Sequence, residues 1–400
     1  MELSATIDNT ARGDASCVSV LCHITGFILA FKGSLTFLFF RSSPQDGAGV
    51  VVALTLGWML LVWSHTMLDP AGVPLKDAGT RIPWWILVYL TLAGASLAWT
   101  TTNSVPVAAA YWAAMVADVL VIWFLLRYQS RETNIIRIVH GFVAGAAVVA
   151  IIAWAAPAMD DLRLGNEDFL HPNLIGFEFA IAALFSAYLA QKNKAWIWAC
   201  AGFIVTILRT LSKGTIVGFL FASLYYVVHG LKISRRVRIY ICVSGAMVLL
   251  AFWGLLEAYL DLYTQGSNLE TLTGRTYIWT TSLDISSEKL WFGHGFDSFR
   301  WVFPPFEAFQ PWHAHNEWIQ QLFAYGMVGL VIVIAVYVSF YRTVRASRNL
   351  SMRSLSTAIL VLVLVRGLVD TDRFELCFPL WLMTMLSITL AGTPSPHYSE

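Results

Sequence analysis

Charged residues are scarce in this chain of 400 residues, where they make up 13% of the sequence against 57% apolar residues. Soluble globular proteins carry about twice that share of charge, so the composition is typical of a membrane protein. The formal net charge is only +1. A chain so close to neutrality presents no basic field of the kind that attracts nucleic acid, and we expect no nucleic-acid partner.

Cysteine is also rare, and the sequence lacks the glycine patterns that bind nucleotides. The five cysteines lie inside or beside apolar runs and show no metal-ligand spacing, which favours buried thiols over disulfides or a zinc site. Without a P-loop or a Rossmann fingerprint, a nucleotide-dependent enzyme is disfavoured. We therefore expect neither a cofactor nor a metal. The polar N-terminus precedes an apolar run without a small-residue cleavage site, which predicts an uncleaved first span.

Long apolar runs are what the sequence has in abundance. A helix needs about 20 apolar residues to cross the hydrocarbon core of a bilayer. By this rule the chain is predicted to be an all-α, polytopic membrane protein with about twelve transmembrane helices, forming a single membrane domain over residues 1–400. The predicted spans are 17–40, 48–64, 84–99, 105–126, 135–157, 174–190, 195–208, 214–229, 239–260, 318–340, 354–369 and 374–391.

The placement of Lys and Arg predicts the orientation of these spans, because short cytoplasmic loops retain positive charge. Basic residues follow the even-numbered spans, as Lys192 and Lys194 do after the sixth and Arg345 after the tenth. Both termini are therefore predicted to be cytoplasmic. The turn after the seventh span is an exception, since Arg209 and Lys213 lie on the outer side. Positive charge placed against this trend indicates a function.

The longest outer segment, residues 261–317, is rich in Trp and Phe. Amphipathic rings in such a segment suit the headgroup layer of a membrane, and they equally suit stacking on sugars. We expect this segment to form a helical cap over an active site, between the ninth and tenth spans.

Polar residues that are unusual for a membrane protein map to the same outer side as this cap. They are His171, Asn173, Arg209, Lys213, Arg275, His313, His315, Asn316, Arg366, Asp370, Asp372 and Arg373. Several cations without a carboxylate cluster of metal-ligand type predict an anionic ligand, such as a phosphate or diphosphate. Each charge contact at about 4 Å contributes roughly 4 kcal/mol at an effective dielectric near 20, so two or three would hold a diphosphate without a metal.

His315 is the candidate general base, because a histidine side chain with an ordinary pKa near 6.5 can accept a proton at neutral pH. Asn316 either caps the helix that follows or holds the acceptor. His313, His171, Asn173 and Arg366 are candidate contacts of the acceptor or glycan.

Other interpretations of these residues remain open. A lone histidine at a membrane interface is commonly just a hydrated residue, and the His-x-His pair lacks the further ligands that a metal site needs. Arg275 could simply cap a helix or extend to the interface. Glu178, one turn inside the sixth span, is a candidate sugar contact, since ionisable groups within spans are functional by default. Lys32 and Asp118 are expected to be internal partners.

Several motifs resemble a known family. The stretch HNEWIQQLFAYGMVG, from His315 to Gly329, is similar to the signature of the O-antigen ligase superfamily, which also contains Wzy-type polysaccharide polymerases. TLTGRTYIW at 271–279 and WFGHGFDSF at 291–299 resemble the stretch that precedes this signature. HPN at 171–173 and LSKGT at 211–215 match weaker upstream elements. The resemblance covers roughly residues 165–330.

The resemblance implies a metal-independent inverting glycosyltransferase that uses glycans on undecaprenyl diphosphate at the periplasmic face of the bacterial inner membrane. It implies that His315 activates the acceptor hydroxyl and that Arg275 holds the diphosphate leaving group. A second cation is expected after the seventh span, where the family's Ser-Arg-Gly is replaced by Ser212-Lys213-Gly214. Because Arg209 lies one helical turn earlier, both Arg209 and Lys213 are candidates for the diphosphate contact.

The identity of the acceptor separates the functions that the resemblance leaves open. With a lipid A-core oligosaccharide as acceptor the protein is an O-antigen ligase, which we expect from the compact cap. With a second lipid-linked glycan it is a Wzy-type O-antigen or exopolysaccharide polymerase, and LTGRT also resembles exopolysaccharide polymerases. A transporter of lipid-linked glycans is a more distant alternative, because its functional charges would line a path through the membrane rather than cluster on one side.

Overall fold

The computed structural model describes residues 2–39, 44–68, 81–127, 131–156, 163–165, 170–231, 234–240, 243–245, 247, 272–305, 310–371 and 378–391. All regular structure within these ranges is helical, which confirms the predicted all-α class. The principal helices are α1 (Glu2–Phe39), α2 (Pro44–Leu68), α3 (Trp84–Ala95), α4 (Val105–Leu125), α5 (Arg131–Ala155), α6 (Pro172–Leu189), α7 (Trp196–Thr210), α8 (Lys213–Gly230), α10 (Leu272–Glu288), α11 (Phe299–Val302), α12 (Glu317–Ala346), α13 (Leu350–Gly367) and α14 (Phe378–Ala391). A short 3-10 helix, η2 (Ser96–Ala98), follows α3.

Within the residues that the structure describes, seven stretches are helical, long and apolar enough to cross a membrane. They are Cys17–Leu35 in α1, Gly47–Leu68 in α2, and helices α4, α5, α6, α12 and α13. Shorter apolar helices occupy 84–98, 196–210 and 379–391. Helices coincide with every predicted span except the ninth, 239–260, which lies mostly outside the described residues. A multi-pass membrane protein is therefore supported, while the count of twelve spans stays a prediction.

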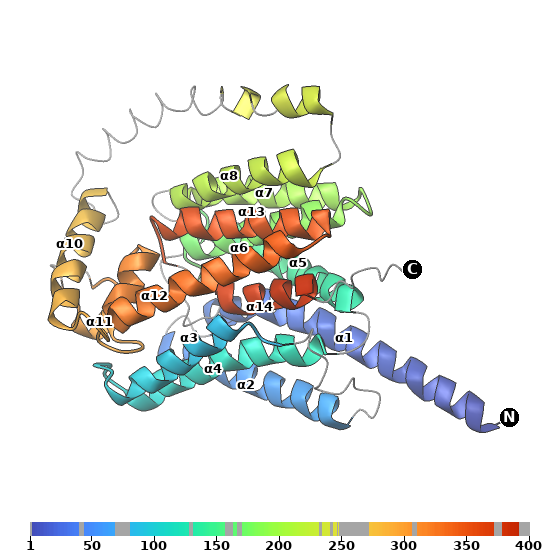
Figure 1. Cartoon of the computed structure of the whole chain (residues 1–400), viewed down its shortest axis with the longest axis horizontal. Helices are drawn as coiled ribbons and strands as arrows, with labels where there is room; N and C mark the ends of the chain where they lie inside the picture. The colour runs from blue at the N-terminus through green and yellow to red at the C-terminus, as the bar shows by residue number, and fades with distance from the viewer. Residues whose placement is uncertain are drawn as a thin grey trace, which may run out of the picture.

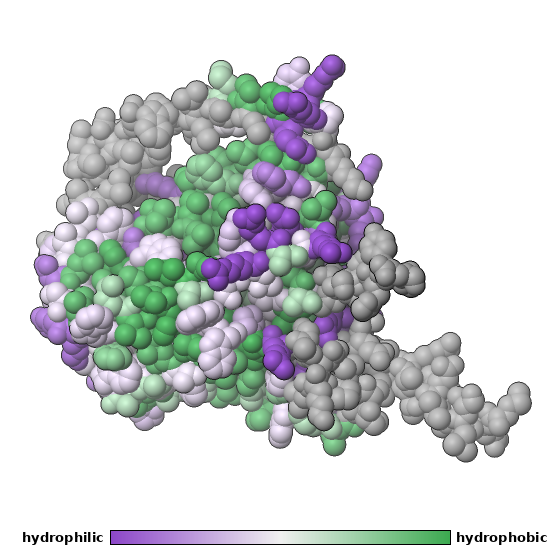
Figure 2. All heavy atoms as spheres, viewed as in Figure 1, coloured by the Kyte–Doolittle hydropathy of each residue, from purple (hydrophilic) through white to green (hydrophobic). Residues whose placement is uncertain are grey.

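The surface of the helical body is largely apolar, as contact with lipid requires. Large side chains such as Ile151, Trp198 and Val331 are 68%, 81% and 57% exposed. In water, exposed apolar patches of this kind would favour association. Figure 2 shows hydrophobic side chains spread over broad areas of the visible face. Apolar side chains thus lie on the surface of the helical body as well as in its core, because the surrounding solvent is the lipid bilayer.

Helix α12 is broken at Gly326, which has φ +65° inside the helix. The segment 290–295 hydrogen-bonds to the backbone at this break: the N–H of Met327 donates to the carbonyl of Leu290 at 2.8 Å, and the N–H of Gly295 donates to the carbonyl of Ala324 at 2.8 Å. A Cβ at position 326 would lie 2.3 Å from the carbonyl carbon of Trp291. Gly326 is therefore required by a positive φ and by a backbone contact, not only by close packing between helices.

The described part of the aromatic segment 261–317 packs on the N-terminal half of α12. Its helices α10 and α11 lie beside this end of α12 (Figure 1). A small apolar cluster joins them, formed by Ile278, Phe299, Phe303, Ala314 and Phe323. The predicted helical content is present, and the location of the segment outside the membrane stays a prediction.

Candidate active site

Four helix ends that are distant in sequence meet at one place, and they carry most of the residues singled out from the sequence. They are the start of α6, the α7–α8 turn, the start of α12 and the end of α13. The side-chain amide of Asn316 donates to the carbonyl of Leu368 at 2.9 Å, which joins α12 to the α13 end. The guanidinium of Arg366 donates to the carbonyl of Asn173 at 3.4 Å, which joins α13 to α6.

Arg163, just before α6, fixes the α7–α8 turn against the start of α6. Its Nη2 donates to the Asn173 side-chain oxygen at 2.9 Å, and its Nε donates to the carbonyl of Thr210 at 3.2 Å. The N–H of Leu164 donates to the carbonyl of Arg209 at 3.2 Å. The backbone of the α7–α8 turn at Arg209 and Thr210 is thereby joined through Arg163 and Leu164 to the start of α6.

The α7–α8 turn also packs tightly against the turn after α13. A Cβ added to Gly214 would lie 2.5 Å from Cγ2 of Val369, so no larger residue fits without displacement. Lys213, the first residue of α8, is exposed, and Arg209 in the last turn of α7 is half-buried. The helix dipole disfavours a cation at a helix N-terminus and favours an anion there. The position of Lys213 is therefore better suited to a bound anion than to stabilising α8.

His315 lies against a buried ion pair at the centre of this junction. Its Nδ1 is 3.5 Å from Oδ1 of Asp370, and Oδ2 of Asp370 accepts a hydrogen bond from Nη2 of Arg366 at 2.9 Å. The N–H of Thr371 donates to Oδ1 of Asp370 at 2.9 Å. Burial alone would raise the pKa of the Asp370 carboxyl, but Arg366 and the two histidines hold this pKa well below its ordinary value. Asp370 is therefore an ionised carboxylate that accepts hydrogen bonds from Arg366 and Thr371 and lies beside the imidazole. Nδ1 of His315 has no hydrogen-bond partner among the described residues.

His313 completes a cluster with His315 and Asp370. The two imidazole rings have centroids 4.2 Å apart, and the N–H of His315 donates to Nδ1 of His313 at 3.3 Å. One ligand atom from each of the three side chains lies within 4.8 Å of the others. From the sequence, the His-x-His pair lacked further metal ligands; the fold supplies a third donor from the turn after α13.

Local backbone structure fixes the positions of His315 and Asn316 at the start of α12. His315 adopts φ +50°, which turns the chain immediately before α12. Asn316 is the N-cap of α12, and its Oδ1 accepts the N–H of Ile319 at 3.1 Å. His171 caps α6 in the same way, accepting the N–H of Asn173 at 3.3 Å through Nδ1. Of the two roles considered for Asn316, the structure contains the cap.

Arg275 lies on α10, half-buried, one turn before Trp279. The indole N–H of Trp279 donates to the carbonyl of Ala314 at 3.0 Å. This bond fixes α10 to the residue that directly precedes His315. Arg275 therefore lies on the helix that this bond fixes beside the turn, about 5.4 Å along the axis from Trp279.

Glu178 does not join the residues described above. Its neighbour Phe177 faces Arg366, whose guanidinium carbon lies 4.4 Å from the ring centroid. Successive residues differ by about 100° around a helix, so Glu178 points to another side of α6. It is 6% exposed, and its Oε1 has no hydrogen-bond partner among the described residues. The contact of Glu178 with sugar stays a prediction.

Two residues of the candidate site were not assigned a role from the sequence. Asp370 was recognised only as a polar residue of its turn, although its spacing of four from Arg366 matches an ion pair along a helix end. Arg163 gave no signal, because its partners Asn173 and Thr210 are set by tertiary folding. Asp372 and Arg373 lie outside the described residues.

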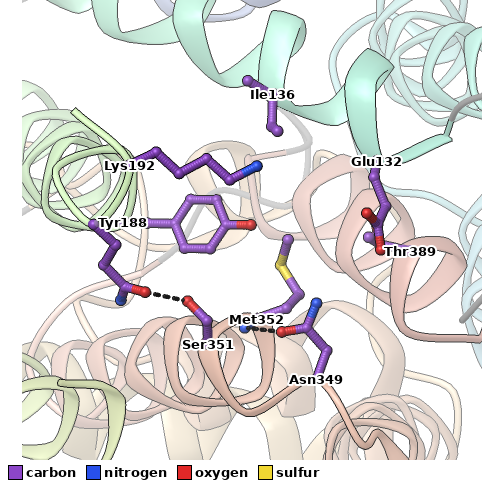
Figure 3. A pocket seen from close by; sticks show the side chains of 9 residues that line it. Glu132, Ile136, Tyr188, Lys192, Asn349, Ser351, Met352 and Thr389 are labelled. Carbon is purple, nitrogen blue, oxygen red and sulfur yellow. Dashed lines mark hydrogen bonds between the residues drawn. The ribbon is translucent and has the colours of Figure 1, made fainter. Parts of the chain in front are cut away.

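A separate cavity of about 270 Å³ lies at the opposite ends of α6 and α13 (Figure 3). Both helices have 18 residues, about 27 Å at 1.5 Å per residue. Ser351 donates to the side-chain oxygen of Gln191 at 2.6 Å across one wall. The lining residues are Glu132, Ile136, Tyr188, Gln191, Lys192, Asn349, Ser351, Met352 and Thr389. This cavity is remote from His315 and contains none of the predicted site residues.

Two comparisons with known proteins agree with the motifs. An O-antigen ligase family model matches residues 198–334, a segment that contains Arg209, Lys213, Arg275 and His315. The exopolysaccharide production protein ExoQ of Rhizobium meliloti (strain 1021) is 24% identical over 247 residues, which cover 53% of this chain and 55% of ExoQ. The chain therefore spans about half the length of this curated relative. The predicted resemblance is confirmed over residues 198–334, which match the O-antigen ligase family model.

Proposed function

We propose that the protein transfers a glycan from undecaprenyl diphosphate to an acceptor sugar hydroxyl at the periplasmic face of the bacterial inner membrane. The observation that carries this proposal is the His315 imidazole, held 3.5 Å from a buried, Arg-paired carboxylate at a junction where cations gather. An ionised Asp370 favours the tautomer of His315 with the proton on Nδ1, which leaves a lone pair on Nε2.

The proposed reaction is a direct displacement. Nε2 of His315 takes the proton of the acceptor hydroxyl as its oxygen attacks the anomeric carbon of the donor. The bond between that carbon and the diphosphate oxygen breaks, and undecaprenyl diphosphate leaves with the electron pair. The new glycosidic bond has the inverted configuration, because the acceptor attacks opposite the leaving group.

Arg275 and either Arg209 or Lys213 are proposed to bind the departing diphosphate, whose charge they stabilise as it develops. Arg366 has a different role in this proposal, since its guanidinium is already bonded to Asp370 and Asn173. It positions Asp370, and through it His315. No metal or other cofactor takes part. His313, His171, Asn173 and Asn316 shape the acceptor side of the site.

The periplasmic location rests on the distribution of Lys and Arg, which favours cytoplasmic termini and an outward site. The arrangement of the four helix ends supports a single site at one end of the helical body. A transporter would need functional charges along the path between the two faces. For a transporter, His315→Ala would leave the lipid-linked glycan on the cytoplasmic leaflet, whereas for a transferase the glycan would accumulate on the periplasmic leaflet.

We propose the O-antigen ligase reaction, with lipid A-core as acceptor, as the first candidate, which the matched family model supports. The second candidate is polymerisation, with another lipid-linked glycan as acceptor. It is favoured by the similarity to a protein of exopolysaccharide production.

The experiment that tests both candidates is an acceptor competition with purified protein in EDTA. Lipid-diphosphate glycan is the donor, and lipid A-core or lipid-linked repeats are offered separately. We expect release of undecaprenyl diphosphate with one acceptor and a loss of roughly 10²–10⁴-fold in His315→Ala. Extension of lipid A-core identifies the ligase, and extension of the repeat identifies the polymerase. A strict metal requirement, or full activity of His315→Ala, would refute the mechanism.

A further inference from the structure

Three metal-binding side chains converge at the candidate active site from two separate parts of the chain. His313 and His315 precede α12, and Asp370 follows α13. Their ligand atoms lie within 4.8 Å of one another. Two ligands of a tetrahedral zinc ion, each at about 2.0–2.1 Å, lie about 3.3 Å apart. Small side-chain rotations would therefore bring the three donors to a common ion.

The chemistry of the donors suits a transition metal. Two imidazoles and one carboxylate form a ligand set that zinc uses in sites with a fourth, open position. Asp370 is oriented by its hydrogen bonds from Arg366 and Thr371, at 2.9 Å each. Carboxylate ligands of metals are typically held by such outer hydrogen bonds. The Asp370 carboxylate is thus oriented by its own hydrogen bonds before any ion binds.

The electrostatic balance of this cluster disfavours a permanently bound ion. The single negative charge of Asp370 is matched by the positive charge of Arg366 at 2.9 Å, so two neutral imidazoles and a neutralised carboxylate face a divalent cation. Such a site has a lower affinity than one built from several anionic ligands. A reversible ligand fits this balance better than a resident cofactor.

We propose that His313, His315 and Asp370 form a reversible binding site for a divalent transition ion such as Zn²⁺, and that the bound ion inhibits glycan transfer. Binding follows from the cluster itself, whereas inhibition rests on the proposed function. The ion occupies an imidazole lone pair of His315 and the carboxylate that orients this imidazole. His315 then cannot accept the proton of the acceptor hydroxyl.

The binding test uses the purified full-length protein, freed of metal, and Co²⁺ as a spectroscopic substitute for Zn²⁺. We expect one Co²⁺ per chain, with visible absorption bands of a site of low coordination number that Zn²⁺ abolishes. His313→Ala should weaken binding at least tenfold. His313→Asn is a second variant, whose amide can still accept the N–H of His315. His229→Ala is the matched control, because His229 lies at the end of α8 away from Lys213 and is bonded to Tyr225. Equal Co²⁺ affinity in His313→Asn and the unmodified protein would overturn the site.

The inhibition test measures release of undecaprenyl diphosphate with increasing Zn²⁺. We expect the midpoint of inhibition to match the dissociation constant for Zn²⁺, with an unchanged midpoint in His229→Ala. Acceleration by Zn²⁺, or no effect at saturating Zn²⁺, would overturn the inhibitory role. Because Co²⁺ binding is measured without donor or acceptor, it is independent of transfer. A protein that binds Co²⁺ through His313 and transfers nothing refutes the proposed function and keeps the metal site.

Discussion

Two buried pairs of a cation and a carboxylate show how similar components serve different purposes. Lys32 and Asp118 join α1 to α4, while Arg366 and Asp370 lie at the end of α13. Both carboxylate side chains are 7% exposed. Asp118 is bonded to Lys32, whereas Asp370 also accepts the N–H of Thr371 and faces His315. Pairing neutralises a buried charge in both places, but only the second pair has an imidazole against it.

The largest expected effect comes from breaking the pair that lacks an imidazole. Asp118→Asn leaves Lys32 without its counter-charge inside the helical body, which should lower the free energy of unfolding by about 3–5 kcal/mol. The measurement is thermal or denaturant unfolding in detergent micelles. The transfer rate per folded molecule should stay unchanged, because the pair lies on α1 and α4, outside the junction of helix ends around His315.

The control for this prediction is the double variant Lys32→Met, Asp118→Leu, which replaces both charges by apolar groups of similar size. It should recover most of the lost stability, because no uncompensated charge remains. If the double variant is as unstable as Asp118→Asn, the effect arises from packing, and the comparison between the two pairs fails.

Replacing the carboxylate of the second pair by an amide should lower the rate of glycan transfer. Asp370→Asn removes the charge that selects the tautomer of His315, and we expect transfer to fall roughly 10²-fold. Steady-state release of undecaprenyl diphosphate between pH 6 and 8 is the measurement. The pKa of Asp370 is held well below its ordinary value, so this carboxyl stays ionised over that range and its own titration does not affect the rate.

Unfolding of Asp370→Asn, measured alongside that of Asp118→Asn, separates an effect on stability from an effect on the transfer rate. Arg366 loses its counter-charge in Asp370→Asn, but it keeps its contacts with the carbonyl of Asn173 and the ring of Phe177. A folded Asp370→Asn protein with an unchanged rate would mean that Asp370, like Asp118, serves only to neutralise a cation.

The difference between the two pairs also shows what sequence reasoning could reach. Apolar runs predicted the helices, because segment length and hydropathy are local properties of the chain. Intramembrane charge predicted Lys32 and Asp118 as partners, which the structure confirms. The approach of Asp370 to His315 could not be predicted, since it depends on how α12 and α13 meet. The left-handed backbone of His315 and the break at Gly326 are likewise set by contacts that are distant in sequence.

The positions of the candidate site residues could be predicted to different degrees, for physical reasons. His315, Asn316, Asn173 and Arg366 meet because each ends or begins a helix on the same side, and topology alone places them together. Glu178 lies within α6, where one residue changes the direction by about 100°, so its facing could not be set from span boundaries that are good to a few residues. The roles of Arg275, Arg209 and Lys213 toward a diphosphate stay predictions.

The smallest effect compares two asparagine caps that have the same capping distance and lie at the opposite ends of α13. Oδ1 of Asn316 accepts the N–H of Ile319 at 3.1 Å, and Oδ1 of Asn349 accepts the N–H of Met352 at 3.1 Å. Replacing either by Ala should lower the free energy of unfolding by about 1 kcal/mol, because each helix loses one capped donor. Unfolding of the two variants under the same conditions measures this.

The rate of glycan transfer should differ between the two cap variants, because Asn316 makes a second hydrogen bond. Its Nδ2 donates to the carbonyl of Leu368 at 2.9 Å, which joins α12 to the end of α13. Asn316→Ala should slow transfer severalfold, whereas Asn349→Ala should not. Asn316→Ser retains a capping oxygen but cannot donate through the longer amide, so it should restore stability while transfer stays slow. Equal transfer rates in Asn316→Ala and Asn349→Ala would show that the Asn316–Leu368 bond does not position His315. The junction of helix ends would then tolerate more movement than general-base catalysis by a fixed imidazole allows.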